Sequence, residues 1–214
     1  MELWKEPNKT LGERCVIFME NEMKLGVMED FPKSYTSKRI KEYFSICTRI
    51  INNKEVPINI SSGSWCAASA SYALHESLSD EEAPHGFRVG VVEIVSDLTK
   101  NKLWRPIDLA KSNQFTPEVG DVIIFDRSNP NDPSTAWFRH IGRIFSISGS
   151  NFECISGNAG GKYKISKHSM TDKNVLGFGE YPGLNRPKLE VIVPEPSTHI
   201  FEDLTDNFYN EYNF

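Results

Sequence analysis

The order of helical and β-rich segments constrains the fold of this chain most. Apolar residues recur at the spacing of amphipathic helices in residues 10–29 and 37–51, and Ser37 is placed to cap the second helix. After residue 120 the pattern changes to short β-rich runs separated by Gly, Asn, Ser and Pro: "GDVIIFDR", "RHIGRIFSIS", "NFECIS" and "GKYKISKH". Helices followed by strands predict an α+β domain, with a helical layer packed on a small antiparallel sheet. Residues 174–182 are expected to form the last edge segment.

The C-terminal part of the chain has a different composition. Pro and Gly punctuate residues 183–199, which indicates an extended arm, so we expect a domain over 1–182 and a linker with a tail over 183–214. Residues 195–214 contain five acidic side chains and no Lys or Arg, and their apolar residues recur at helical spacing. We expect this segment either to fold back on the domain or to dock a partner protein as a helix in a groove.

Charge and hydropathy exclude several classes of protein. The formal net charge is −5 and no block of Lys or Arg is present, so we expect neither a nucleic-acid partner nor a membrane partner. No stretch reaches the roughly 18 apolar residues of a membrane-spanning helix, and the start "MELWKEPNKTLGERC" lacks the pattern of a secretory signal. We therefore expect synthesis in the cytoplasm without a signal peptide.

The four cysteines lack the paired CxxC spacing of a zinc site and the density of a disulfide scaffold, so we expect no metal and no cofactor. Cys15, Cys47 and Cys154 follow the apolar periodicity of their segments and are interpreted as core residues. Cys66 differs, because the "SSGS" before Trp65 supplies turn and N-cap chemistry, and Cys66 opens the small-residue run "CAASASYAL". A thiol in the first turn of a helix is favoured as the nucleophilic thiolate, and the small residues would let this helix lie close to a sheet.

A cysteine nucleophile needs a base, and His140 is the best placed candidate. His75 lies nine residues after Cys66 on the same predicted helix, about 13 Å along its axis. His85 falls in a loop and His199 in the tail. His140 opens the strand "HIGRIF", which should pair with the preceding strand "GDVIIF".

Three further residues have both a functional and a structural interpretation. Asn158 follows the strand "NFECI" and should reach the same end of the sheet as His140, where it would orient the imidazole; alone, an Asn in "GNAGG" is typical of a turn. Trp65 and Trp137 flank Cys66 and His140 and are candidate walls of a substrate cleft, although core packing is the commoner role of Trp.

Four segments, "GSWCAASASYAL", "PEVGDVIIF", "RHIGRIFSI" and "SGNAGG", together resemble the CHAP family of cysteine, histidine-dependent amidohydrolases and peptidases. The resemblance covers roughly residues 11–182. It implies a papain-like α+β fold in which Cys66 is the nucleophile, His140 the general base and acid, and Asn158 the orienting residue. Many relatives have Gly where this chain has Arg139, and Glu where it has Ser156.

The resemblance also implies the substrate, which is an amide bond of peptidoglycan. The cut would fall between the sugar lactyl group and the first Ala, or within the stem peptide and its cross-bridge. Such an enzyme would reach the wall or periplasm as a secreted antibacterial effector or as a phage lysin. The alternatives are an intracellular cysteine peptidase acting on proteins, and an inactive binding module whose Cys and His are structural.

Overall fold

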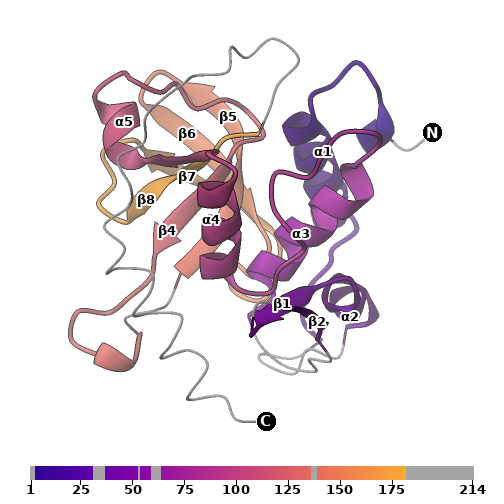
Figure 1. Cartoon of the computed structure of the whole chain (residues 1–214). Coiled ribbons are helices and arrows are strands. Elements are labelled where there is room, and N and C mark those ends of the chain that lie inside the picture. Colours follow the sequence, from indigo (N-terminus) through magenta and orange to yellow (C-terminus); the bar gives the residue numbers. More distant parts are fainter. Residues whose placement is uncertain (1–2, 31–36, 53, 59–63, 136–138, 182–214) are drawn as a thin grey trace.

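The computed structural model describes residues 3–30, 37–52, 54–58, 64–135 and 139–181 (Figure 1). Its α-helices are α1 Leu11–Lys24, α2 Lys38–Ser45, α3 Cys66–Ser77, α4 Val91–Lys100 and α5 Ile107–Lys111, with short 3₁₀ turns at Leu3–Lys5 and Pro133–Thr135. Its strands are β1 Thr48–Ile51, β2 Lys54–Pro57, β3 Trp104–Pro106, β4 Val122–Asp126, β5 Arg139–Ser148, β6 Asn151–Ser156, β7 Lys164–Ser169 and β8 Val175–Gly179. Helices and antiparallel strands confirm the predicted α+β class.

The main sheet has six strands in the order β3-β8-β4-β5-β6-β7, all antiparallel to their neighbours. The predicted pairing of β4 with β5 is confirmed. The prediction that residues 174–182 form an edge is wrong, because β8 lies between β3 and β4. The edge belongs to β3, a short strand that the sequence pattern did not reveal.

The two N-terminal helices follow the periodicity of their segments to different extents. Helix α1 is confirmed, and a capping box fixes its start: the Thr10 N–H donates to the Glu13 carboxylate at 2.8 Å and the Glu13 N–H donates to the Thr10 hydroxyl at 3.2 Å. Helix α2 ends at Ser45, so the helix predicted over 37–51 is half as long. The β-branched residues that follow pair with β2 instead, and Ser37 makes no side-chain cap hydrogen bond.

The two faces of the main sheet have different neighbours. One, here called the helix face, carries the side chains of Val122, Ile124, Ile141 and Ile155, which pack with α1, α3 and α4 in one core cluster. The other, here called the pocket face, carries Ile123, Phe125, Ile144, Phe152 and Phe178, with α5 against part of it. In Figure 1, α1 and α3 lie together beside the sheet.

Helix α3 lies close to the sheet, as its small residues predict. Its alanines at positions 67, 68, 70 and 73 are fully buried, and the helix contacts β5 and β6. Gly157, just after β6, has no room for a side chain, because a Cβ there would meet Ser69 and would lie 2.6 Å from the Trp65 ring. The first turn of α3 is therefore fixed against the end of β6.

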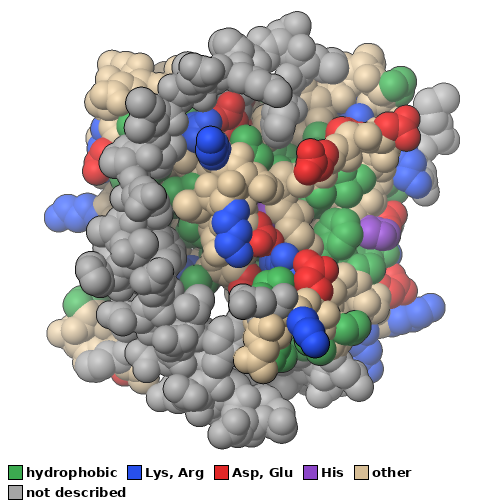
Figure 2. Space-filling view, in the orientation of Figure 1, with side chains coloured by type: hydrophobic (Ala, Val, Ile, Leu, Met, Phe, Trp, Pro, Cys, Tyr) green, Lys and Arg blue, Asp and Glu red, His purple; other side chains and the backbone are tan. Residues whose placement is uncertain are grey.

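Charges of both signs are mixed on the visible face of the molecule (Figure 2), and the described helices are too short or too polar to span a membrane. On the face shown in Figure 2, Lys and Arg side chains are interspersed with Asp and Glu. No helix in the described ranges is long and apolar enough to cross a bilayer. Within the same ranges, no three His, Cys, Asp or Glu side chains are grouped to hold a metal ion.

Candidate active site

Cys66 is the first residue of α3, with Trp65 at the N-cap position. The backbone N–H groups of a first helical turn have no partner within the helix, and their dipoles favour negative charge nearby. The Cys66 sulfur lies 3.4 Å from the Ser64 hydroxyl, and the residue is only 2% exposed. The structure thus has the predicted helix start, although Trp65, rather than a serine, is the cap and makes no side-chain cap hydrogen bond.

Asn158 supports the Cys66 end of the site and not His140. It has a φ of 58°, a left-handed conformation that Asn tolerates, in the turn after β6. In the amide orientation that satisfies both of its polar atoms, its oxygen accepts from the Ser64 hydroxyl at 2.9 Å and from the Trp65 backbone N–H at 3.2 Å. Its nitrogen donates to the Glu29 carboxylate at 3.2 Å. Asn158 therefore reaches the predicted end of the sheet, but its side chain holds the segment before Cys66.

Trp65 is a core residue. It is fully buried, its ring packs against those of Tyr43 and Tyr163 at centroid distances of 6.0 and 5.5 Å, and its indole N–H donates to Glu29 at 2.9 Å. An enclosed ring cannot form the wall of an open cleft, so the structure contradicts that interpretation of Trp65. Trp137 and His199 lie outside the described residues.

The three remaining cysteines are buried, as predicted from their periodicity. Burial raises the pKa of Cys47 and Cys154 to about 12, and it raises the pKa of Cys15 as well. These thiols stay protonated at neutral pH and are poor nucleophiles.

His140 lies at the start of β5, on the pocket face of the sheet. His140 is paired with Phe125 on β4, so both side chains lie on the pocket face of the sheet. The centroids of the two rings are 6.3 Å apart. The residue is 4% exposed, and its Nε2 atom has no hydrogen-bond partner among the described residues. Burial first, and then the charges of Arg127 and His168, lower the pKa of His140 from 6.5 to about 3. The imidazole is thus neutral at physiological pH, and a pKa this low makes it a weaker base than an ordinary histidine.

The structure does not join Cys66 and His140 by a hydrogen bond. Cys66 belongs to the core cluster of the helix face, whereas His140 shares the pocket face with Phe125. The turn at residues 157–161 has contacts near both residues: Asn158 bonds to Ser64 beside the thiol, while Ala159 and Gly160 line a pocket with His140.

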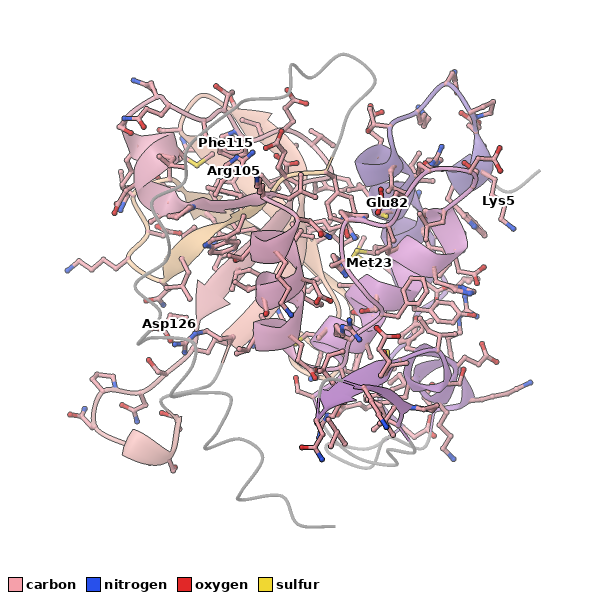
Figure 3. All side chains as sticks on the ribbon, viewed as in Figure 1. Lys5, Met23, Glu82, Arg105, Phe115 and Asp126 are labelled. Atoms are coloured by element: carbon pink, nitrogen blue, oxygen red, sulfur yellow. The ribbon has the colours of Figure 1, made fainter. Side chains whose placement is uncertain are left out.

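That pocket has a volume of about 540 Å³ and is open to solvent. Its lining comes from the ends of β4, β5, β6 and β7 and from the turns beside them: Phe125, Asp126, Arg127, His140, Ser156, Ala159, Gly160, Lys164, Ser166, His168, Asp172, Lys173 and Asn174. Asp126, labelled in Figure 3, marks the β4 end of this pocket. Cys66 is not among these residues.

A second imidazole in the pocket escaped the sequence analysis. His168 on β7 has its Nε2 atom 2.8 Å from the Ser166 hydroxyl and its Nδ1 atom 3.3 Å from the Asp172 carboxylate. Its ring lies between those of Phe125 and Phe152, at centroid distances of 4.6 and 5.6 Å. The alternation of Ser166 and His168 along a β-rich run was the available signal, because residues two apart share one face of a strand.

Comparisons with known proteins give little further information. No family model matches the chain, and no curated protein matches it. A solved structure described as "The crystal structure of Ly7917 with the hydrolyzing product of MDP" is similar over 67% of this chain, with 13% sequence identity and a TM-score of 0.35. The similarity covers 61% of that structure's chain. At this identity and TM-score the likeness assigns neither a family nor an activity.

Proposed function

We propose that this protein is a papain-like, cysteine-dependent hydrolase that cleaves an amide bond of peptidoglycan. The observation that carries the proposal is the position of Cys66. It is the first residue of α3, a helix of small residues that packs on β5, and His140 is the second residue of β5. The first turn of a helix presents backbone N–H groups to a negative charge, and histidine is the commonest general acid and base.

In the proposed reaction, the Cys66 thiolate attacks the carbonyl carbon of the amide, and the backbone N–H of Cys66 helps to hold the oxyanion. His140 takes the thiol proton and gives it to the leaving amine. Water then hydrolyses the thioester and restores the thiol. This chemistry requires the His140 ring to come within hydrogen-bond reach of the Cys66 sulfur. The two side chains lie on different faces of the sheet, so the proposal includes a rearrangement of the strand end that carries His140 when substrate binds.

The proposed substrate rests on the sequence resemblance to CHAP enzymes. An enzyme of this class would act at the cell wall or periplasm after delivery by a secretion machine or by lysis, as an effector or a lysin. An immunity or secretion partner belongs to the same proposal.

A second candidate function, that of a serine hydrolase, is favoured by the hydrogen bonds that link Ser166, His168 and Asp172. A hydroxyl on Nε2 of a histidine and a carboxylate on its Nδ1 form the arrangement of a serine hydrolase triad. In this alternative, Ser166 is the nucleophile and Cys66 is structural.

Digestion of purified peptidoglycan, followed by mass analysis of the fragments, tests the main proposal. Free stem peptides would identify an amidase and shortened stems an endopeptidase. Cys66→Ala should abolish both, while Cys47→Ala, which removes another buried thiol, should retain activity. An unchanged wall, or full activity in Cys66→Ala, would contradict the proposal.

A further inference from the structure

We propose that the pocket beside His140 binds a carboxylate group, the terminal carboxylate of a peptide substrate. This inference rests on the proposed function for the identity of the substrate, but the binding itself does not depend on hydrolysis.

The charges that line the pocket favour an anion. Arg127, Lys164 and Lys173 have no ion-pair or hydrogen-bond partner within the part of the chain that the structure describes. The pocket's two acids are, in contrast, already engaged. Asp126 forms an ion pair with Arg139 at 2.9 Å and accepts the Ser128 N–H at 2.8 Å.

Asp172, the second acid, is held in the same way. It accepts the Ser169 N–H at 3.1 Å and lies 3.3 Å from His168 Nδ1. Burial is the main cause of the low pKa of His140, and the positive charge of Arg127 adds to it. The pocket lining thus has three Lys and Arg side chains against two carboxylates, and an entering carboxylate would meet a net positive charge.

The Nε2 atom of His140 is enclosed and has no hydrogen-bond partner among the described residues, so a carboxylate that displaces the side chains covering it would gain a specific donor. Buried polar atoms nearly always have a partner, and a side chain as enclosed as this one loses free energy when it has none. The neutral imidazole can carry its proton on Nε2 and donate it to a carboxylate oxygen, while the cations of the lining balance the charge. Both features belong to the lining of one pocket.

A carboxylate on Nε2 would also prepare His140 for the proposed reaction. The atom that binds one ring nitrogen fixes which tautomer is present, and a proton on Nε2 leaves the lone pair on Nδ1 free to accept the thiol proton. Asn158 does not provide this contact, because its amide holds Ser64 and Trp65. The substrate would thus provide the acceptor that the protein side chains lack at this position.

The shape of the pocket suits the end of a peptide. Its volume of about 540 Å³ holds a few residues, and a Cβ added at Gly160 would meet nothing within 4 Å, so one wall is open. The opposite side of the same turn contacts the segment before Cys66 through Asn158. A peptide anchored in the pocket by its carboxylate would cross this turn to reach the thiol.

Calorimetry with the Cys66→Ala protein tests the inference without hydrolysis. The probes are an acetylated dipeptide with a free terminal carboxylate and the same dipeptide as its carboxamide. We expect the carboxylate to bind about tenfold tighter or more, since a charge-assisted hydrogen bond with ionic support is worth that much. Adding Lys164→Ala and Lys173→Ala should remove most of this preference, whereas Lys167→Ala, an exposed lysine on the other face of β7, should keep it.

The outcomes separate the inference from the proposed function. Equal binding of the two dipeptides, or no binding of either, would overturn the carboxylate site. So would a loss of the carboxylate preference in Lys167→Ala as large as that in Lys164→Ala and Lys173→Ala. Inorganic phosphate that binds as tightly as the dipeptide would overturn its assignment to a carboxylate. Selective carboxylate binding in a protein whose wild type leaves peptidoglycan intact would support the site and refute the proposed function alone.

Discussion

The two faces of the main sheet are built from alternate residues of the same strands, yet they serve different purposes. On the helix face, Ile124 and Ile141 are sealed under α1, α3 and α4, and this packing holds Cys66 at the start of α3. On the pocket face, the apolar cluster around Phe152 gives way to a polar pocket with His140 and His168. Packing fixes the candidate nucleophile, whereas space and unpaired charge mark the candidate binding site.

Trp65→Ala should have the largest effect, because it removes the ring that supports the first turn of α3 on the helix face. The ring is fully buried and its N–H donates to Glu29, so we expect a loss of about 3–5 kcal/mol in the free energy of unfolding. Urea denaturation measures this loss. Lys164→Ala on the pocket face is the control and should change stability by less than about 0.5 kcal/mol. A stable Trp65→Ala protein that only loses activity would restore Trp65 as a cleft residue.

Acidification should lower the free energy of unfolding through two buried histidines, one on each face of the sheet. His85, next to Tyr181 in the helix-face core, has a pKa lowered to about 4, mainly by burial, and that of His140 is lowered to about 3. Below pH 6.5 the unfolded chain binds protons that the folded chain does not, so stability falls as the pH falls towards these values. The loss at pH 5 is about 2 kcal/mol for each histidine.

Urea denaturation of the wild type, His140→Gln and His85→Gln at pH 7 and pH 5 measures these two contributions. Each variant should lose about 2 kcal/mol less than the wild type between the two pH values. Equal pH dependence in all three proteins would show that neither imidazole is held neutral by the fold.

Asn158→Ala should have the smallest effect, because Asn158 sits in the turn between the faces and contributes only hydrogen bonds. Loss of its contacts with Ser64, Trp65 and Glu29, together with the left-handed backbone, should cost about 1–2 kcal/mol. Asn158→Gly keeps the backbone conformation and isolates the hydrogen bonds. Turnover should fall by less than it does in Cys66→Ala. If Asn158→Ala is as inactive as Cys66→Ala while remaining stable, Asn158 acts directly in catalysis.

Local features of the sequence predicted much of the fold. The periodicity of residues 11–24, the small-residue run after Cys66 and the β-rich runs of β4 to β7 each specify their own element. Helix α4 was missed although Val91, Ile94, Val95 and Leu98 carry a helical spacing. The position of β8 inside the sheet depends on pairing with β3, some seventy residues earlier, which no local pattern encodes.

The site was less predictable than the fold. The side of the sheet on which His140 lies depends on the register of β5 with β4, and a shift of one residue would move every side chain to the other face. The burial of Trp65 likewise depends on Tyr43 and Tyr163, which are far from it in the sequence. Residue types identify candidates for catalysis, but long-range pairing decides which of them meet.

The site of covalent acylation tests the central claim most directly. The protein would be mixed with a small activated ester, quenched in acid, and digested to locate the added acyl group by mass spectrometry. The account predicts one acyl group on Cys66, released by neutral hydroxylamine and absent from Cys66→Ala. An acyl group on the β7 peptide that contains Ser166, or none on Cys66, would contradict it.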